Sequence, residues 1–345
     1  MFDVVIICDW SGNSKPKTGK DSIWMARGAI EDPEQPTVLN PATRLEAFQQ
    51  ALAWLTDAVE QDLRTLFCAD FAYGFPEGFP AAIGLGNDFM HVWTLLNHLY
   101  DIPGGGDEQN SLSQFALANE LNSLFAENNP DHHDGPFWGR TDWTTLNHTL
   151  DQLPADVQNA APFARGQRAD GGAERRNICE ARGIVPGNYP YLKMTSPVFP
   201  LQYQDGVLRR LRRTEEGRPG VQEPWKIYGP GSVGGQTLCG IPYIYRLLTH
   251  DTLGPVSEVW PMTTGFGNPL KKETKILHAE IFPNTIPLNL DLHPIRDACQ
   301  VIGLVQHVLE KQAADELAVS FDPPAHLSPI ELAAVQAQEG WILFS

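Results

Sequence analysis

The 345-residue sequence lacks long apolar runs, paired cysteines and a leader segment, and each absence excludes a class of protein. No stretch approaches the ~20 consecutive apolar residues of a membrane-spanning helix, so we expect no membrane segment. The chain starts with neither a basic leader nor a small-residue cleavage site, which favours a cytoplasmic protein. Its five cysteines are an odd number without a Cys-x-x-Cys pair, which indicates neither a disulfide framework nor a zinc knuckle.

Basic residues are also scarce, since 25 Lys and Arg stand against 42 Asp and Glu and give a formal net charge of −17. This balance argues against a duplex nucleic acid partner, which usually needs a basic face. Residues 165–226 are the exception, with 12 Lys and Arg against 7 Asp and Glu, and their densest run is Arg209, Arg210, Arg212 and Arg213. Such a run is typical of a solvated or ion-paired face, but guanidinium groups also match phosphate oxygens, so phosphate binding is the alternative.

Two acidic residues follow buried strands and are the most informative feature of the chain. Asp9 comes after the apolar run 4–8, and Asp70 comes after the run 65–69. Continuous apolar runs of about five residues predict strands of a sheet covered on both faces. Ligands of open α/β sheets bind at the carboxyl ends of such strands. Two neighbouring carboxylates there repel unless a proton or a divalent cation lies between them, although each aspartate alone is also typical of a turn or a cap.

The order of elements after the first strand carries a resemblance. The elements that follow are, in order, a hairpin through residues 22–27, a third strand near 37–39, a helix over 45–59 and the strand that ends at Asp70. This order resembles the ribonuclease H-like fold. The resemblance implies acidic metal ligands on strand 1, strand 4 and the last core helix, which correspond here to Asp9, Asp70 and Asp297. Glu280, at the end of a later strand, is a possible fourth ligand, and the implied ions are Mg²⁺ or Mn²⁺.

The chain also resembles a bacterial family within that superfamily. The motifs that carry this resemblance are Asp-Trp-Ser-Gly at 9–12, Gly-Pro-Phe-Trp-Gly at 135–139, Gly-Ser-Val-Gly-Gly-Gln at 231–236 and Glu-Ile-Phe-Pro at 280–283. We therefore predict an α/β protein with a ribonuclease H-like mixed sheet flanked by helices and a large insertion. Its expected parts are a core of 1–100 and 235–325, an insertion of 101–234 that is Arg-rich in 165–226, and a C-terminal helix and edge segment at 326–345.

Two small turns are candidates for binding the phosphate of a nucleotide cofactor or substrate. The turn after Asp9 is not a P-loop, because its glycine spacing is wrong, but Ser11 and Gly12 can present backbone N–H groups to an anion. Residues 229–234 fit G-x-G-x-x-G but follow only a short apolar run, so a dinucleotide site is weakly indicated. We expect instead that Gly231 and Ser232 lead into a helix over 235–248 whose N-terminal amides can accept a phosphate.

The insertion contains two further motifs with open interpretations. Phe137 and Trp138, flanked by glycines, form either an aromatic lid over the site or a hydrophobic plug against the core. His132, His133 and Asp134 are either metal ligands or part of a polar loop, and the polar loop is favoured because adjacent histidine side chains diverge.

Together these features predict a divalent-metal-dependent phosphodiester hydrolase, nuclease-like, that acts on nucleic acid or a nucleotide. With two metal ions about 4 Å apart, one would generate hydroxide and the other would stabilise the leaving oxygen. One alternative is an actin- or sugar-kinase-like phosphotransferase that uses Asp9-x-Ser11-Gly12 as a phosphate loop, although such proteins duplicate the fold. The other is a non-catalytic binding module of the same fold. The sequence does not indicate an oligomeric state.

Overall fold

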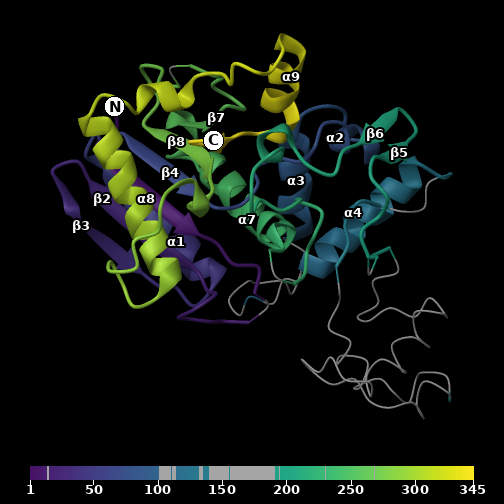
Figure 1. Ribbon diagram of the computed structural model, residues 1–345, viewed down its shortest axis with the longest axis horizontal. Helices are drawn as coiled ribbons and strands as arrows, with labels where there is room; N and C mark the ends of the chain where they lie inside the picture. Colours follow the sequence, from purple (N-terminus) through teal and green to yellow (C-terminus); the bar gives the residue numbers. More distant parts are fainter. Residues whose placement is uncertain are drawn as a thin grey trace.

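A mixed sheet of seven strands forms the centre of the computed structural model (Figure 1). The structure describes residues 1–13, 15–100, 110, 114–131, 135–139, 155, 191–193, 195–229, 231–267 and 269–345. The strands of the sheet are β1 (Val4–Asp9), β2 (Trp24–Ala29), β3 (Asp32–Leu39), β4 (Thr65–Ala69), β7 (Ser257–Trp260), β8 (Ile276–Ile281) and β9 (Ile342–Leu343). Their order is β3-β2-β1-β4-β8-β7, and β9 also pairs with β8. The predicted mixed α/β architecture is therefore confirmed.

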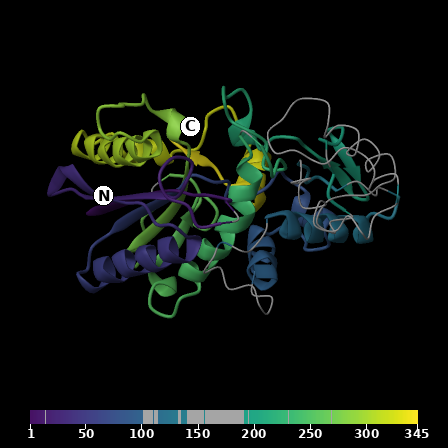
Figure 2. The same ribbon diagram turned by 90° about the horizontal axis from the view of Figure 1, so that it is seen from below.

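Helices pack on both faces of this sheet, as Figure 2 shows for α1 and α8. The helices are α1 (Arg44–Glu60), α2 (Phe79–Ala82), α3 (Phe89–Tyr100), α4 (Gln114–Asn128), α7 (Val233–Leu248), α8 (Arg296–Ala313) and α9 (Pro329–Ala334). The predicted helices over 45–59 and 235–248 correspond to α1 and α7. No helix in the described ranges combines the length and the apolarity that crossing a membrane requires.

Alternation along β1 explains why helices cover both faces. Val4, Ile6 and Cys8 pack with the helix α1 side of the core, whereas Val5 and Ile7 pack with α8. Both sets are almost completely buried, since side chains of a strand point alternately to opposite faces and both faces are covered. The central strand is therefore held in one register, because a slip by one residue would exchange the two sets.

The C-terminal segment and Arg212 of the insertion both contact the end of β8. Within residues 101–234 the structure describes α4 and a small hairpin of β5 (Leu201–Tyr203) and β6 (Gly206–Leu208). At the other end of the chain, Ser328 caps α9, and the Ser328 side chain accepts the N–H of Glu331. A short π-helical turn over Val335–Glu339 then leads into β9 beside the end of β8. Parts distant in sequence thus meet where the parallel strands end.

Candidate active site

A cavity of about 760 Å³ lies at the carboxyl ends of β1, β4 and β8. Parallel strands of an open sheet end together, so the polar residues that follow them gather at one edge. The acidic and basic side chains that line the cavity are Asp9, Asp21, Asp70, Arg212, Glu215, Glu280 and Asp297. All four acids singled out in the sequence are therefore at its wall, and six carboxylates outnumber one guanidinium among the described lining residues.

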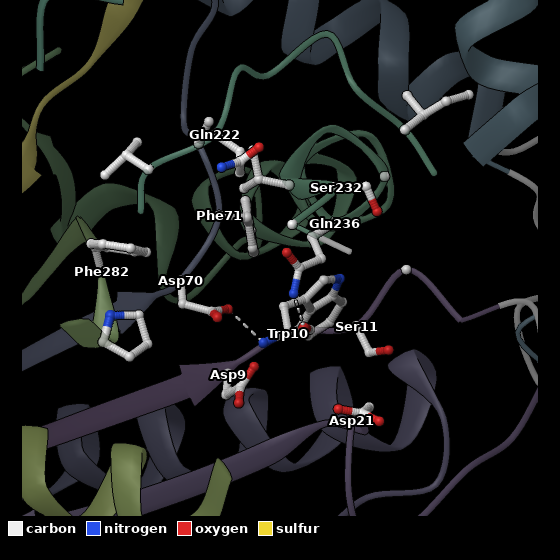
Figure 3. Close-up of a pocket in the computed structure, with 18 of the residues that line it drawn as sticks. Asp9, Trp10, Ser11, Asp21, Asp70, Phe71, Gln222, Ser232, Gln236 and Phe282 are labelled. Carbon is white, nitrogen blue, oxygen red and sulfur yellow. Dashed lines mark hydrogen bonds between the residues drawn. The ribbon is translucent and has the colours of Figure 1, made fainter. Parts of the chain in front are cut away.

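Asp9 and Asp70 form a contacting pair of carboxyl groups. The register of the parallel strands aligns Cys8 with Ala69, so the next residue of each strand places these two aspartates side by side. Their carboxyl groups lie close enough that each shifts the pKa of the other. The N–H of Trp10 also donates to Oδ1 of Asp70 at 2.6 Å (Figure 3). Two buried carboxylates this close repel each other unless a proton or a cation lies between them.

Burial and mutual repulsion shift the titration of this pair. Desolvation raises the pKa of Asp9 well above its ordinary value, and the charge of Asp70 raises it further. Desolvation also raises the pKa of Asp70, to about 7, although the Trp10 N–H favours its ionised form. Two adjacent carboxylates that cannot both ionise are a frequent property of catalytic and metal-binding sites.

Asp297 approaches the pair from helix α8. It lies in the first turn of that helix, as the sequence predicted, and its charge raises the pKa of both Asp9 and Asp70. Its Oδ2 accepts the backbone N–H of Asp21 at 2.6 Å. This bond ties α8 to the turn before β2. Within the described residues, no three Asp, Glu, His or Cys side chains are grouped closely enough to hold a metal ion by themselves.

Glu280 lies on the opposite face of the sheet from the aspartate pair. The register of β4 and β8 aligns Glu280 with Ala69 and hence with Cys8, one residue before Asp9 and Asp70. Side chains alternate along a strand, so this offset sends Glu280 to the other face. There its two oxygens accept Nη1 and Nη2 of Arg212 at 2.7 and 2.6 Å. The expected fourth ligand is thus engaged by a guanidinium group.

The four arginines considered for phosphate binding are all paired with carboxylates. Arg212 is fully buried and also bonds Glu215 at 2.7 Å through Nε and the carbonyl of Glu339 at 2.8 Å through Nη1. Arg213 donates to Glu339 and Glu77. At longer range, Arg209 pairs with Glu216 at 3.3 Å and Arg210 with Glu223 at 3.6 Å. The expectation that this run binds phosphate gains no support, whereas an ion-paired arrangement was the other interpretation. Arg175, Arg176 and Arg182 lie outside the described residues.

The turn after β1 lines the cavity but is fixed by the protein itself. Oγ of Ser11 accepts the N–H of Asn13 at 3.2 Å. The buried guanidinium of Arg44 donates to the carbonyls of Asn13 at 2.8 Å and of Ser11 at 3.4 Å. A side chain at Gly12 would come within 3.1 Å of the Gly235 backbone, so glycine allows this turn to pack against α7. Arg44 was not recognised in the sequence, because nothing marks one arginine of a helix as buried.

The start of α7 also lines the cavity, but its first amides are already used. The N–H groups of Ser232, Val233 and Gly234 donate to the carbonyls of Gly229, Gly231 and Lys226. A phosphate at this helix end would have to displace those bonds. What α7 contributes instead is Gln236, whose Nε2 donates to the carbonyl of Trp10 at 2.6 Å and fixes the peptide beside the aspartate pair (Figure 3).

Phe137 and Trp138 of the insertion differ in their surroundings, so the plug and lid interpretations do not apply equally to both. Phe137 is completely buried against Phe75, Phe79 and Trp225, as a hydrophobic plug would be. Trp138 is only partly buried, and its indole N–H donates to Glu223 at 2.8 Å. His132, His133 and Asp134 lie outside the described residues.

The aspartate pair predicts an unusual pH dependence of stability in the presence of a chelator. The pKa of Asp70 is about 7 in the folded protein against an ordinary value of 3.8, so folding favours its protonated form. This stabilisation is complete below the ordinary pKa and is lost as the pH rises through about 7. The free energy of unfolding, measured by urea denaturation across this window, should therefore fall with rising pH, and Asp70→Asn should flatten the profile.

The control is Asp57→Asn, which removes a carboxylate whose side chain is 52% exposed on α1. Its profile should run parallel to that of the wild-type protein. If the Asp70→Asn profile also runs parallel, the two carboxyl groups do not share a proton.

No protein family matches this chain by sequence, and no curated protein or solved structure matches it either. The geometry of the cavity is therefore the basis for assigning a function.

Proposed function

We propose that this cavity is a divalent-metal-dependent hydrolytic site for a phosphodiester of a nucleotide or a nucleic acid. The observation that carries the proposal is the contact between Asp9 and Asp70 at the ends of two adjacent parallel strands. An aspartate side chain is ionised in neutral water, yet here burial and mutual repulsion raise the pKa values of the pair. A divalent cation is the natural replacement for a proton between them, since it allows both groups to ionise.

The composition of the cavity wall fits a cation better than it fits a bare anion. Six carboxylates and one guanidinium line the described part of the wall, and that guanidinium is already shared by Glu215 and Glu280. A phosphate group entering alone would meet net negative charge. Mg²⁺ is usually held by one or two protein carboxylates together with water and substrate phosphates, so two aspartates suffice.

Three residues have roles in the proposal. Asp9 and Asp70 would hold Mg²⁺ or Mn²⁺ directly, and Asp297 would contribute charge from the first turn of α8. Such a cation supplies activation of a water molecule and neutralisation of the leaving oxygen. Trp10 and Gln236 orient the pair through the bonds to Asp70 and to the Trp10 carbonyl. Glu280 is outside this set, because both of its oxygens bind Arg212.

The resemblance to the ribonuclease H-like fold supports the same proposal. The strand order places an antiparallel hairpin beside β1 on one side and the parallel strands β4 and β8 on the other. The three acids that the resemblance implies lie on β1, after β4 and on α8, and all line one cavity. We therefore propose a ribonuclease H-like core for residues 1–100 and 235–325.

The cation requirement gives the test of the proposed function. Mg²⁺ or Mn²⁺ should raise the free energy of unfolding by about 2.7 kcal/mol at a hundredfold excess over its Kd, because it binds only the folded state. Asp9→Asn should abolish this gain and should itself stabilise the metal-free protein, since it removes one of two repelling groups. Thermal unfolding with and without chelator measures both effects.

A capping aspartate would behave in the opposite way, because its replacement costs about 1 kcal/mol and does not change the response to metal. An unchanged melting temperature in saturating Mn²⁺ would exclude the metal site. Hydrolysis of a generic phosphodiester such as bis-p-nitrophenyl phosphate then separates a hydrolase from a phosphotransferase or a binding module, because only the hydrolase uses water as acceptor.

A further inference from the structure

A second hollow, of about 570 Å³, lies beside the acidic cavity, and we call it the basic groove. Its charged and aromatic lining residues are Trp138, Arg210, Glu215, Arg218, Glu223 and Lys226. Glu215, Val221 and Gln222 line both hollows, so the segment 219–222 forms their common wall. Two hollows of opposite charge therefore share one wall.

The charges of the basic groove are not balanced by its own carboxylates. Glu215 is engaged by the buried Arg212, and Glu223 accepts the Trp138 indole and pairs with Arg210. These two acids are thus neutralised by partners already described. Arg218 is a further cation of the groove, and the Lys226 ammonium lies 5.9 Å from the centre of the Trp138 ring.

Arg218 is the most informative member of the groove. Its Nε donates to the carbonyl of Thr214 at 2.6 Å, which fixes the plane of the guanidinium. No carboxylate of the described chain forms an ion pair with it, in contrast to Arg209, Arg210 and Arg212 nearby. Partial burial without such a partner lowers its pKa. A partly desolvated cation without a counter-charge is stabilised when an anion binds beside it.

The geometry of Arg218 and Trp138 indicates which anion fits. The Arg218 Nε bond leaves the two terminal nitrogens as a fork that matches phosphate oxygens. Trp138 is partly exposed and lines the groove, and aromatic rings in such a position stack with bases. A site that binds a phosphate beside an aromatic ring matches the phosphate and the base at the end of a nucleotide chain.

We propose that the basic groove binds a terminal phosphate of the substrate, with Arg218 as its main contact and Trp138 as a platform for the adjoining base. This inference rests on the proposed function and narrows its substrate to a short phosphodiester with a second phosphate, such as a linear dinucleotide with a 5′-terminal phosphate. The scissile group would then lie at Asp9 and Asp70 in the neighbouring cavity. A long polyanion is disfavoured by the net charge of −17.

The first experiment measures binding of AMP to the metal-free protein by calorimetry in the presence of a chelator. Arg218→Gln should weaken AMP binding roughly 10- to 100-fold, as expected for the loss of charge-assisted hydrogen bonds. Trp138→Leu should weaken the binding of AMP but not the binding of inorganic phosphate. The matched control is Arg209→Gln, which comes from the same segment, pairs with Glu216 and lines neither hollow. Thermal unfolding of each variant shows that it is folded.

Equal AMP affinity in Arg218→Gln and the wild-type protein, or no AMP binding at all, would overturn the proposal. Asp9→Asn should retain AMP binding, so this result does not depend on the metal site. If AMP binds through Arg218 while Mn²⁺ has no effect on stability, the phosphate site in the groove is supported and the proposed hydrolase function is excluded. If Mn²⁺ stabilises the protein while Arg218→Gln binds AMP normally, only the groove fails.

The second experiment tests the substrate class directly. Hydrolysis of a dinucleotide with a 5′-terminal phosphate should show a KM roughly tenfold lower than that of the same dinucleotide without it. Arg218→Gln should remove this difference, whereas the control Arg209→Gln should keep it. A KM that does not depend on the terminal phosphate would contradict the assignment.

Discussion

Arg212→Met should lower the free energy of unfolding by about 3–5 kcal/mol, the largest stability effect that we expect in this protein. The guanidinium is buried and bonds Glu215, Glu280 and the carbonyl of Glu339. Its removal leaves two carboxylates without their cation in a wall that is already acidic, and burial already raises the pKa of Glu215 to about 7. Urea denaturation of the variant and the wild-type protein measures the loss.

Arg209→Met is the matched control, since Arg209 lies three residues away in the same run and both it and its partner Glu216 are about half exposed. It should change the free energy of unfolding by less than about 1 kcal/mol, because surface ion pairs contribute little. The double variant Arg212→Met, Glu280→Met should recover part of the loss, because it also removes a buried charge. Equal destabilisation by the two single variants would contradict the central position of Arg212.

Asp70→Asn should reduce metal-dependent phosphodiester hydrolysis by about a thousandfold while the protein remains folded. A metal ion contributes several kcal/mol of charge stabilisation in the transition state, and each 1.4 kcal/mol corresponds to a tenfold change in rate. Asparagine retains an oxygen that can accept the Trp10 N–H, so the backbone beside the pair should not move. The measurement is kcat/KM in saturating Mn²⁺ together with the melting temperature.

Asp21→Asn is the corresponding control, because Asp21 lines the same cavity but its side chain is 70% exposed and its backbone, not its carboxylate, binds Asp297. It should cost less than about tenfold in kcat/KM, since the charge of a solvated carboxylate is screened. A residual activity in Asp70→Asn close to that of Asp21→Asn would show that the reaction, if any, takes place elsewhere.

The sequence was sufficient to place the aspartate pair because local patterns determine it. An apolar run followed by an acid defines a strand and its end, and parallel pairing of two such strands then aligns Asp9 with Asp70. The resemblance likewise placed Asp297 on the last core helix, and α8 brings it to the same edge. These predictions needed only the type and direction of each element.

The sequence was not sufficient to place Glu280 or the arginine run, because both depend on long-range register. A shift of one residue between β4 and β8 decides which face Glu280 occupies, and nothing within either strand fixes that shift. The partners of Arg212 and Arg213 come from β8 and from the turn before β9, far along the chain. Charge counts over residues 165–226 therefore could not show which cations were already neutralised.

The position of β4 in the sheet has a consequence for the synthesis of the chain. All five residues of β4 are buried in the finished fold, and one of its edges is covered only by β8, which begins at Ile276. While the intervening insertion is being translated, β1 to β4 can pair but β4 presents an open apolar edge. Such edges associate with other chains, so we expect the nascent protein to be most prone to aggregation during this interval.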